Sequence, residues 1–542
     1  MRGTQLVLIL ILWRLAMKNR NKLTWISLIL VVMLVVLAGC QPVNGLDLNK
    51  VFQNGTNVKS VQGTQKLTLE LTPNASVTPT ADEQKMLEIF SKVSVSLTEM
   101  KQQDLTHFSA KGVFEYNKGQ IPFQLSMSDD EYIFLIEGAK KPIVIHTGMS
   151  SLQQLNGKLS QEMEQQFKDL RKKATEFAPT IVSFFLGNAP NPKIITVGDG
   201  KANIHGEGLK GKDIHLEIKG SDLLELVKGF LTNVLADEKG LKELLGQVFD
   251  LYAPMMQQAA KEGDQESNTF NDTIAPFLNN KSLAVGFAYT AINTYLKDML
   301  AKYDQSVQEL LNSPSGEDLS KLLNDSLYLK MDLFVDSELT TRKSNMEFAY
   351  SLPDTESAVK GLKINASSEI WDVNKPVTAD KIDTSKGQLE LTTLGKPSRV
   401  ISVVDPKSRL YTLLKEDLNI TKKEITMIMG SQDDYVGDSS KPYNSNGTIM
   451  VPVRFVVEQL DADVAWESST QKVTVTDLVS GAVINLNVGS KQATVNGMIK
   501  LLDKESELTN GSTYVPIRFI AESMGAKVNW NQELQMVTIT RD

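Results

Sequence analysis

The chain has very little cysteine and histidine for its length. Its 542 residues include one cysteine and four histidines. A single cysteine excludes a disulfide bond within the chain, so stability must come from buried apolar side chains. The histidines are His107, His146, His205 and His215. They are scattered, whereas a copper or zinc centre needs several converging histidine or thiolate ligands. We therefore expect no metal and no other cofactor.

An excess of basic residues is also missing. The formal net charge is -8 and the calculated pI is near 5.4. A nucleic-acid-binding protein would carry a basic face, so we expect no nucleic-acid partner. Hydrophobic residues make up 41% and charged residues 23% of the chain, which is typical of globular proteins. The length suggests about three domains.

Familiar catalytic motifs are absent. The sequence contains neither G-x-S-x-G nor H-E-x-x-H. Residues 206–211 satisfy G-x-G-x-x-G, but residues 214–218 alternate as in a strand, whereas a nucleotide-binding loop leads into a helix. We predict a glycine-rich hairpin turn here and no enzymatic activity. A hydrolase with dispersed catalytic residues stays open as an alternative.

The N-terminal region carries the marks of a secretory signal. Lys18, Arg20 and Lys22 precede an apolar run over residues 26–38. Basic residues, an apolar run and small residues at a cleavage point define such a signal. The run is shorter than the roughly 18 residues that a membrane span needs. We predict a signal peptide over residues 1–39, and the basic residues after Met17 favour a start there, with residues 1–16 a mis-called extension.

The end of this signal resembles the lipobox of bacterial lipoproteins. Leu37, Ala38 and Gly39 stand directly before Cys40. The resemblance implies that the Cys40 thiol receives a diacylglyceryl group and that Cys40 becomes the mature N-terminus. Two acyl chains anchor stably because each buried CH₂ contributes about 0.8 kcal/mol. We therefore expect an extracytoplasmic protein on the outer face of the cell membrane of a Gram-positive-type bacterium.

Composition and periodicity divide the rest of the chain. Residues 40–81 are rich in polar residues, glycine and proline, which predicts a flexible tether after the lipidated cysteine. Within this segment residues 67–71 alternate like a strand, which leaves open that this part pairs with another strand. Residues 82–385 show strands, then helices, then strands, which predicts an α+β body with a central antiparallel sheet packed with helices. This order resembles the half-barrel of the LolA and LppX lipoprotein carriers. That resemblance implies an apolar cavity between the sheet and the helices of residues 221–311. Residues 386–419 read as a connector.

An internal repeat occupies the C-terminal region. Residues 451–458 recur at 515–522, and the register continues to the tryptophan of each copy. Each copy has a turn, a short strand, a helix that starts near a proline, and a further strand. This predicts a small α+β domain of two strand-helix-strand repeats over residues 420–542. The shared residues are Pro452, Arg454, Phe455, Glu458 and Trp466, and then Pro516, Arg518, Phe519, Glu522 and Trp530.

Residues 510–530 resemble the copper amine oxidase N-terminal domain, also called a stalk domain. The pattern is Asn-Gly, then Val-Pro-x-Arg-Phe, then Glu, Gly-Ala and Trp. In that family the copper and the amine oxidation belong to a different domain, so the resemblance implies no copper chemistry. One departure stands out: the glycine after the helix is Gly525 in the second copy but Asp461 in the first. Aspartate suits a left-handed helix cap less well, so we expect a weaker first cap.

The repeated charged and aromatic residues have two interpretations each. Arg454 and Arg518 either bind carboxylates and other anions or pair with Glu458 and Glu522 four residues along a helix. Trp466 and Trp530 either stack on sugar rings or belong to the core. We favour the internal role in both cases.

These features predict a non-catalytic cell-surface lipoprotein. We expect it to bind a ligand or scaffold a complex in the envelope, with the C-terminal domain in contact with cell wall or envelope proteins. The alternative is a carrier of lipid or another apolar ligand in the central sheet domain.

Overall fold

The computed structural model describes residues 43–129, 131–146, 177, 179–262, 276–314, 316–351, 356–429, 442–509 and 511–541. The predicted signal peptide, the lipobox and Cys40 lie outside this set. The chain forms two compact units. The first contains the described residues up to Glu131 and from His146 to Lys381, and the second contains Tyr132–Ile145 and the residues from Ile382 onward.

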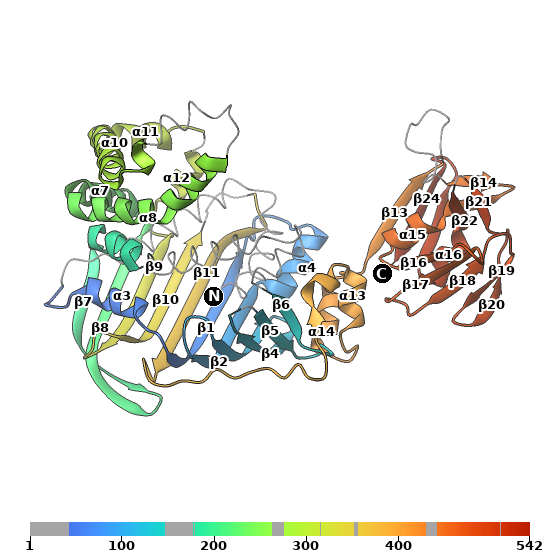
Figure 1. Ribbon diagram of the computed structural model, residues 1–542, viewed down its shortest axis with the longest axis horizontal. Helices are drawn as coiled ribbons and strands as arrows, with labels where there is room; N and C mark the ends of the chain where they lie inside the picture. Colours follow the sequence, from blue (N-terminus) through green and yellow to red (C-terminus); the bar gives the residue numbers. More distant parts are fainter. Residues whose placement is uncertain are drawn as a thin grey trace. The chain divides into compact units, whose positions relative to one another are not determined.

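A large antiparallel sheet forms the first unit, in the order β4-β3-β2-β1-β11-β10-β9-β8-β7 (Figure 1). With the helices described below, this sheet confirms the predicted α+β fold. The strands are β1 (Val61–Pro73), β2 (Lys92–Gln102), β3 (Phe108–Tyr116), β4 (Gly119–Met127), β7 (Ile194–Ile204), β8 (Glu207–Lys219), β9 (Tyr328–Asp336), β10 (Thr341–Ser351) and β11 (Val359–Trp371).

The expectation of a flexible tether over residues 40–81 is wrong for most of that segment. Residues Leu48–Thr56 form helix α3, and β1 pairs with β2 on one side and with β11 on the other. The leucines of Leu67–Leu71 alternate with Thr68 and Glu70, so one strand face is apolar and the other is polar. This alternation is a strand signal in the sequence, but it does not reveal that the whole of Val61–Pro73 pairs on both sides. Helix α4 (Ala81–Phe90) then begins with a capping box between Thr80 and Glu83.

Helices cover one end of the apolar sheet face. They are α7 (Leu223–Ala236), α8 (Glu238–Glu262), α10 (Lys281–Ala301), α11 (Tyr303–Leu311) and α12 (Glu317–Leu322). Leu223 and Leu226 of α7 join Leu216 and Ile218 of β8 in one buried cluster, and α3 packs on β7, β8 and β9 in another. No helix in the described part of the chain is both long and apolar enough to cross a membrane.

The second unit begins with a small group of short elements. They are β5 (Glu131–Ile136), β6 (Ile143–His146), β12 (Leu389–Glu390), α13 (Pro397–Ser402) and α14 (Arg409–Tyr411), followed by a π-helical turn over Thr412–Asp417. Strand β12 runs parallel to β6. We expected residues 82–385 to form one body, but residues 132–145 group with the predicted connector instead. The reason is long-range pairing between β6 and β12, which local periodicity does not reveal.

The C-terminal module contains the two predicted repeats (Figure 1). Its sheets have the orders β13-β24-β23, β14-β15-β22-β21 and β16-β17-β18-β19-β20. The elements are β13 (Lys423–Ile428), β14 (Tyr443–Ser445), β15 (Thr448–Pro452), α15 (Val453–Gln459), β16 (Asp463–Glu467), β17 (Lys472–Thr476), β18 (Val483–Asn487), β19 (Gln492–Val495), β20 (Met498–Leu501), β21 (Glu507–Thr509), β22 (Ser512–Pro516), α16 (Ile517–Ser523), β23 (Lys527–Asn531) and β24 (Met536–Arg541).

Equivalent residues of the two repeats face each other. Strands β15 and β22 pair antiparallel with Val451 opposite Val515, its counterpart in the other repeat. The Tyr443 hydroxyl donates to Glu507 at 2.6 Å, again between two positions 64 residues apart. Self-complementary contacts of this kind are the mark of two-fold symmetry. The module is therefore a pseudo-symmetric pair of repeats around one shared core.

Candidate binding surfaces

The first candidate surface is the apolar face of the large sheet. Leu67 lies opposite Val95 and Ala366, and Leu69 lies opposite Val93 and Ile364. The row continues outward because Val95 lies opposite Phe114, and Phe114 lies opposite Ile121. Paired residues share a face of the sheet, so these side chains form one continuous apolar surface.

Burial divides this surface into two parts. Over β8, β9 and β10 it is closed, because Leu216, Leu329 and Phe348 are fully buried beneath helices. Over β11, β1, β2 and β3 it is only partly covered, with Leu69 and Val93 buried and other side chains more accessible. There the side chains of Leu67, Val95, Phe114, Ile364 and Ala366 are half-buried. The apolar surface over these four strands is therefore less completely covered than the surface over β8, β9 and β10.

The opposite face of the sheet is polar and carries ion pairs. Lys92 approaches Glu70 at 2.7 Å, and Lys363 approaches Glu347 at 2.7 Å. The Tyr328 hydroxyl donates to Glu347 at 2.6 Å, and burial together with this bond raises the pKa of Tyr328 to about 12. Bonds from Lys363 and Tyr328 lower the pKa of Glu347. This face therefore stays ionised and solvated at neutral pH.

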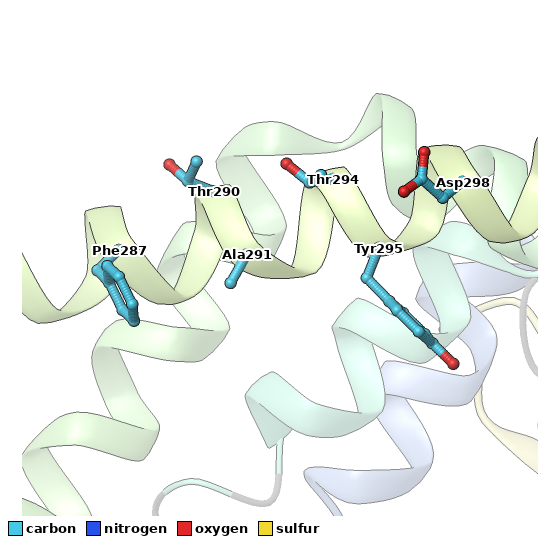
Figure 2. A pocket seen from close by; sticks show the side chains of 6 residues that line it. All are labelled: Phe287, Thr290, Ala291, Thr294, Tyr295 and Asp298. Carbon is cyan, nitrogen blue, oxygen red and sulfur yellow. The ribbon is translucent and has the colours of Figure 1, made fainter.

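The described residues do not show the enclosed cavity that we expected between the sheet and the helices of residues 221–311. Where α7 and α12 meet the sheet, the interface is a packed cluster. A shallow hollow lies on α10 instead, and Figure 2 shows that all its lining side chains come from that one helix. They are Phe287, Thr290, Ala291, Thr294, Tyr295 and Asp298. A second hollow lies between α7 and α11.

The histidines occupy separate places in the first unit. His107 contacts Asp104 at 3.0 Å, and His215 contacts Asp332 at 2.8 Å. His205 stacks on Trp371 with ring centres 4.1 Å apart. The glycine-rich motif forms the predicted turn between β7 and β8, with Gly206 at a φ of +86°. Across the described residues, no three histidine, cysteine or acidic side chains gather as metal ligands would.

The C-terminal module separates its signature residues into buried and exposed groups. Pro452 and Pro516 are buried at the starts of α15 and α16, where a missing N–H carries no penalty. Phe455, Phe519 and Trp530 pack against the shared core. The charged signature residues are all exposed; they are Arg454, Glu458, Arg518 and Glu522.

Two expectations for these residues have different outcomes. Arg454 approaches Glu458 at 3.3 Å, so the first repeat has the internal pair that we favoured. The core position expected for Trp466 is wrong, because its side chain is 40% exposed. Trp466 lies near the end of β16, an edge strand, whereas its counterpart Trp530 packs against the core. A shared motif therefore does not give the two tryptophans the same environment.

A buried ion pair, which the repeat pattern did not predict, links the two repeats. Arg541 donates from Nη1 to both carboxylate oxygens of Asp477, at 3.0 and 3.1 Å. It also donates to the carbonyl oxygen of Leu460. Both side chains are almost fully buried. Positions 477 and 541 are 64 residues apart, so they are equivalent positions of the two repeats. One is an aspartate and the other an arginine, so a comparison of identical residues between the repeats does not reveal the pair.

Together, the fold and these surfaces define a two-unit α+β protein with an amphipathic sheet and a pseudo-symmetric C-terminal module. Residues 423–539 of this chain match the family model of the copper amine oxidase N-terminal domain. The match covers the C-terminal module and leaves the first unit unassigned.

Two further comparisons give similarities to known proteins. The chain is 37% identical over 83 residues to a protein named "Protease inhibitor" from Brevibacillus choshinensis. This segment is 15% of the chain and spans 24% of that relative's length. The crystal structure of the lipoprotein LppX of Mycobacterium tuberculosis aligns with 62% of this chain and 100% of its own, at 10% identity and a TM-score of 0.19.

Proposed function

We propose that this protein is a non-catalytic lipoprotein of the cell envelope that binds an apolar ligand. The half-buried apolar surface over β11, β1, β2 and β3 carries the proposal. In this proposal the C-terminal module makes the contact with the cell wall or with envelope proteins.

The chemistry of the sheet face suits a hydrocarbon. Leu67, Val95, Phe114, Ile364 and Ala366 carry no polar side-chain atoms. Covering such a surface contributes about 25 cal/mol for each Å² of apolar area removed from water. An acyl chain meets this requirement without leaving a buried polar group unpaired.

The short path from the lipobox to the folded body supports a position at the membrane. Residues from Val43 onward are described, and Asn44 donates to the carbonyl oxygen of Val197 in β7 at 3.0 Å. An extended residue spans at most about 3.6 Å, so three residues from Cys40 reach roughly 10 Å. A lipidated Cys40 would therefore hold the first unit against the bilayer, where apolar ligands are available.

A binding assay with a fluorescent sixteen-carbon fatty acid tests the ligand proposal. The protein is prepared without its leader and Cys40 and is titrated with the probe. We expect Val95→Asp to weaken binding about tenfold or more, because it places a charge on the apolar face. Ser96→Asp is the matched control, since Ser96 lies opposite Lys66 on the other face.

Two results would count against the proposal. One is no saturable binding of the fatty acid by the unaltered protein. The other is equal loss of binding in both aspartate variants while circular dichroism shows both to be folded. Anchoring is tested separately, by mass spectrometry of the mature protein from membranes, where a diacylglyceryl group on Cys40 is expected.

The activity named for the Brevibacillus relative belongs to a protein of which this chain matches 24%. Inhibition of a protease therefore does not follow for this chain.

A further inference from the structure

Strand β20 exposes an unusual amount of apolar side chain. Met498, Ile499 and Leu501 are 67%, 70% and 74% exposed. They lie within one four-residue strand at the end of the five-stranded sheet, as Figure 1 shows. Exposed apolar edge strands are templates for pairing with another strand, and proteins ordinarily protect them.

The opposite edge of the same sheet is protected in the usual way. Strand β16 ends that side and carries Asp463 and Glu467. Lys396 and Arg399 from the preceding segment approach Asp463 at 3.2 and 3.5 Å. One edge is thus charged and covered by ion pairs, whereas the other is apolar. The exposed apolar edge is therefore specific to β20 within this sheet.

The hairpin geometry decides which backbone groups of β20 point outward. Asn496 and Gly497 form a two-residue turn with φ values of +50° and +81°, and Val495 pairs with Met498. The Leu502 N–H donates back to Lys491 at 2.8 Å. Hydrogen-bonded pairs alternate along an antiparallel ladder, so Met498 and Lys500 point their backbone groups toward β19. The N–H and C=O groups of Ile499 and Leu501 therefore point away from the sheet.

Charge indicates what kind of strand fits. Residues 488–502 contain Lys491 and Lys500 and no acidic residue. Along β20, Ile499 and Leu501 share one face with Thr494 and Gln492, while Lys500 lies on the other face with Met498. A matching strand would present apolar side chains to Ile499 and Leu501 and carboxylates to Lys500.

We propose that β20 is a docking edge at which an extended strand of another protein, with alternating apolar and acidic side chains, adds to the five-stranded sheet. Main-chain bonds to Ile499 and Leu501 supply affinity, and Lys500 selects for acidic residues. This deepens the proposed contact role of the C-terminal module, but its test is independent of fatty acid binding.

Two synthetic peptides test the edge on the protein lacking its leader and Cys40. One alternates valine with glutamate, and the other alternates valine with lysine. Fluorescence anisotropy should show saturable binding of the valine–glutamate peptide and at least about tenfold weaker binding of the valine–lysine peptide. Lys500→Glu should reverse this preference. Equal affinity for both peptides, or no binding of either, would overturn the proposal.

Backbone variants separate strand addition from simple apolar adhesion. Ile499→Pro removes an outward N–H while leaving the bonds to β19, and it should weaken valine–glutamate binding by about fivefold or more. Leu534→Ser is the control, because Leu534 is 60% exposed in the β23–β24 turn, outside β20. Unchanged peptide binding by Ile499→Pro would overturn the proposal. Self-association of the protein in light scattering that is lost in Ile499→Pro would also overturn it, because β20 would then pair with a second copy of this chain. Thermal unfolding confirms that each variant is folded.

Discussion

The two repeats of the C-terminal module share a sequence signature and a strand-helix-strand order, yet they end their helices differently. The residue that follows the cap of the first helix is Asp461, with a φ of +58°, and its counterpart after the second helix is Gly525, with a φ of +76°. Both residues adopt the left-handed conformation that closes a helix, and only glycine does so without strain. Both repeats therefore require a left-handed backbone conformation at this position, but they meet it with different residue types.

In the first repeat, Asp461 makes contacts that Gly525 of the second repeat does not make. Lys423 of β13 approaches the Asp461 carboxylate at 2.9 Å, and Ser398 donates to its carbonyl oxygen at 2.7 Å. These contacts offset part of the conformational cost of an aspartate there. A glycine can make no such side-chain contact, and the space around Gly525 is open. Similar helix ends are thus reached by a side-chain contact in one repeat and by backbone freedom in the other.

The largest effect is expected at the ion pair that joins the repeats. Arg541→Met leaves the Asp477 carboxylate buried without its partner, so the module should lose about 3–5 kcal/mol of unfolding free energy. Denaturant-dependent hydrogen exchange of β17 and β24 in the full chain measures this loss. Arg454→Ala is the control, since it breaks an exposed pair and should cost less than about 0.5 kcal/mol. Similar losses in the two variants would show that the buried pair does not hold the repeats together.

An exchange of the helix-end residues tests the comparison itself. Gly525→Asp forces an aspartate into the left-handed region without the contacts of the first repeat, and should destabilise the module by about 1 kcal/mol. Asp461→Gly removes strain but also the Lys423 contact, so it should change stability by less than about 0.5 kcal/mol. The same hydrogen exchange measurement applies to both. Equal and opposite effects would mean that the Lys423 contact contributes nothing.

The smallest effect concerns the Tyr443–Glu507 bond between equivalent positions. Burial and the bond to Glu507 raise the pKa of Tyr443 to about 12, whereas an unfolded tyrosine titrates near pH 10. Because the folded-state pKa is the higher one, this stabilisation is complete below pH 10 and is lost as the pH rises toward 12.

Tyr443→Phe tests that pH dependence. At pH 8 the variant should be less stable by about 1 kcal/mol, through loss of the hydrogen bond to Glu507. Thermal unfolding from pH 8 to 12 should show the gap between the two proteins closing above pH 10. A gap that stays constant over this range would contradict the role assigned to the tyrosine proton.

Local patterns predicted part of this molecule well. Pro452 and Pro516 located both helices of the module, and the alternating strands of the central region predicted an antiparallel sheet. Long-range pairing was not visible in the same way. The expected tether contains β1, whose partners on one side come from β11, about 300 residues along the chain. The candidate apolar surface depends on that pairing, because Leu67 meets Ala366 only through it.

The sequence by itself determined where the repeats lie, which residues start their helices, and which strands have one apolar face. These properties follow from spacing and side-chain type within a few residues. The tertiary structure decided which strands become neighbours, that Asp477 and Arg541 meet in a core, and that Trp466 is exposed while Trp530 is packed. The physical reason is that burial and pairing depend on the whole set of contacts that close around a residue, and a motif specifies only the nearest of them.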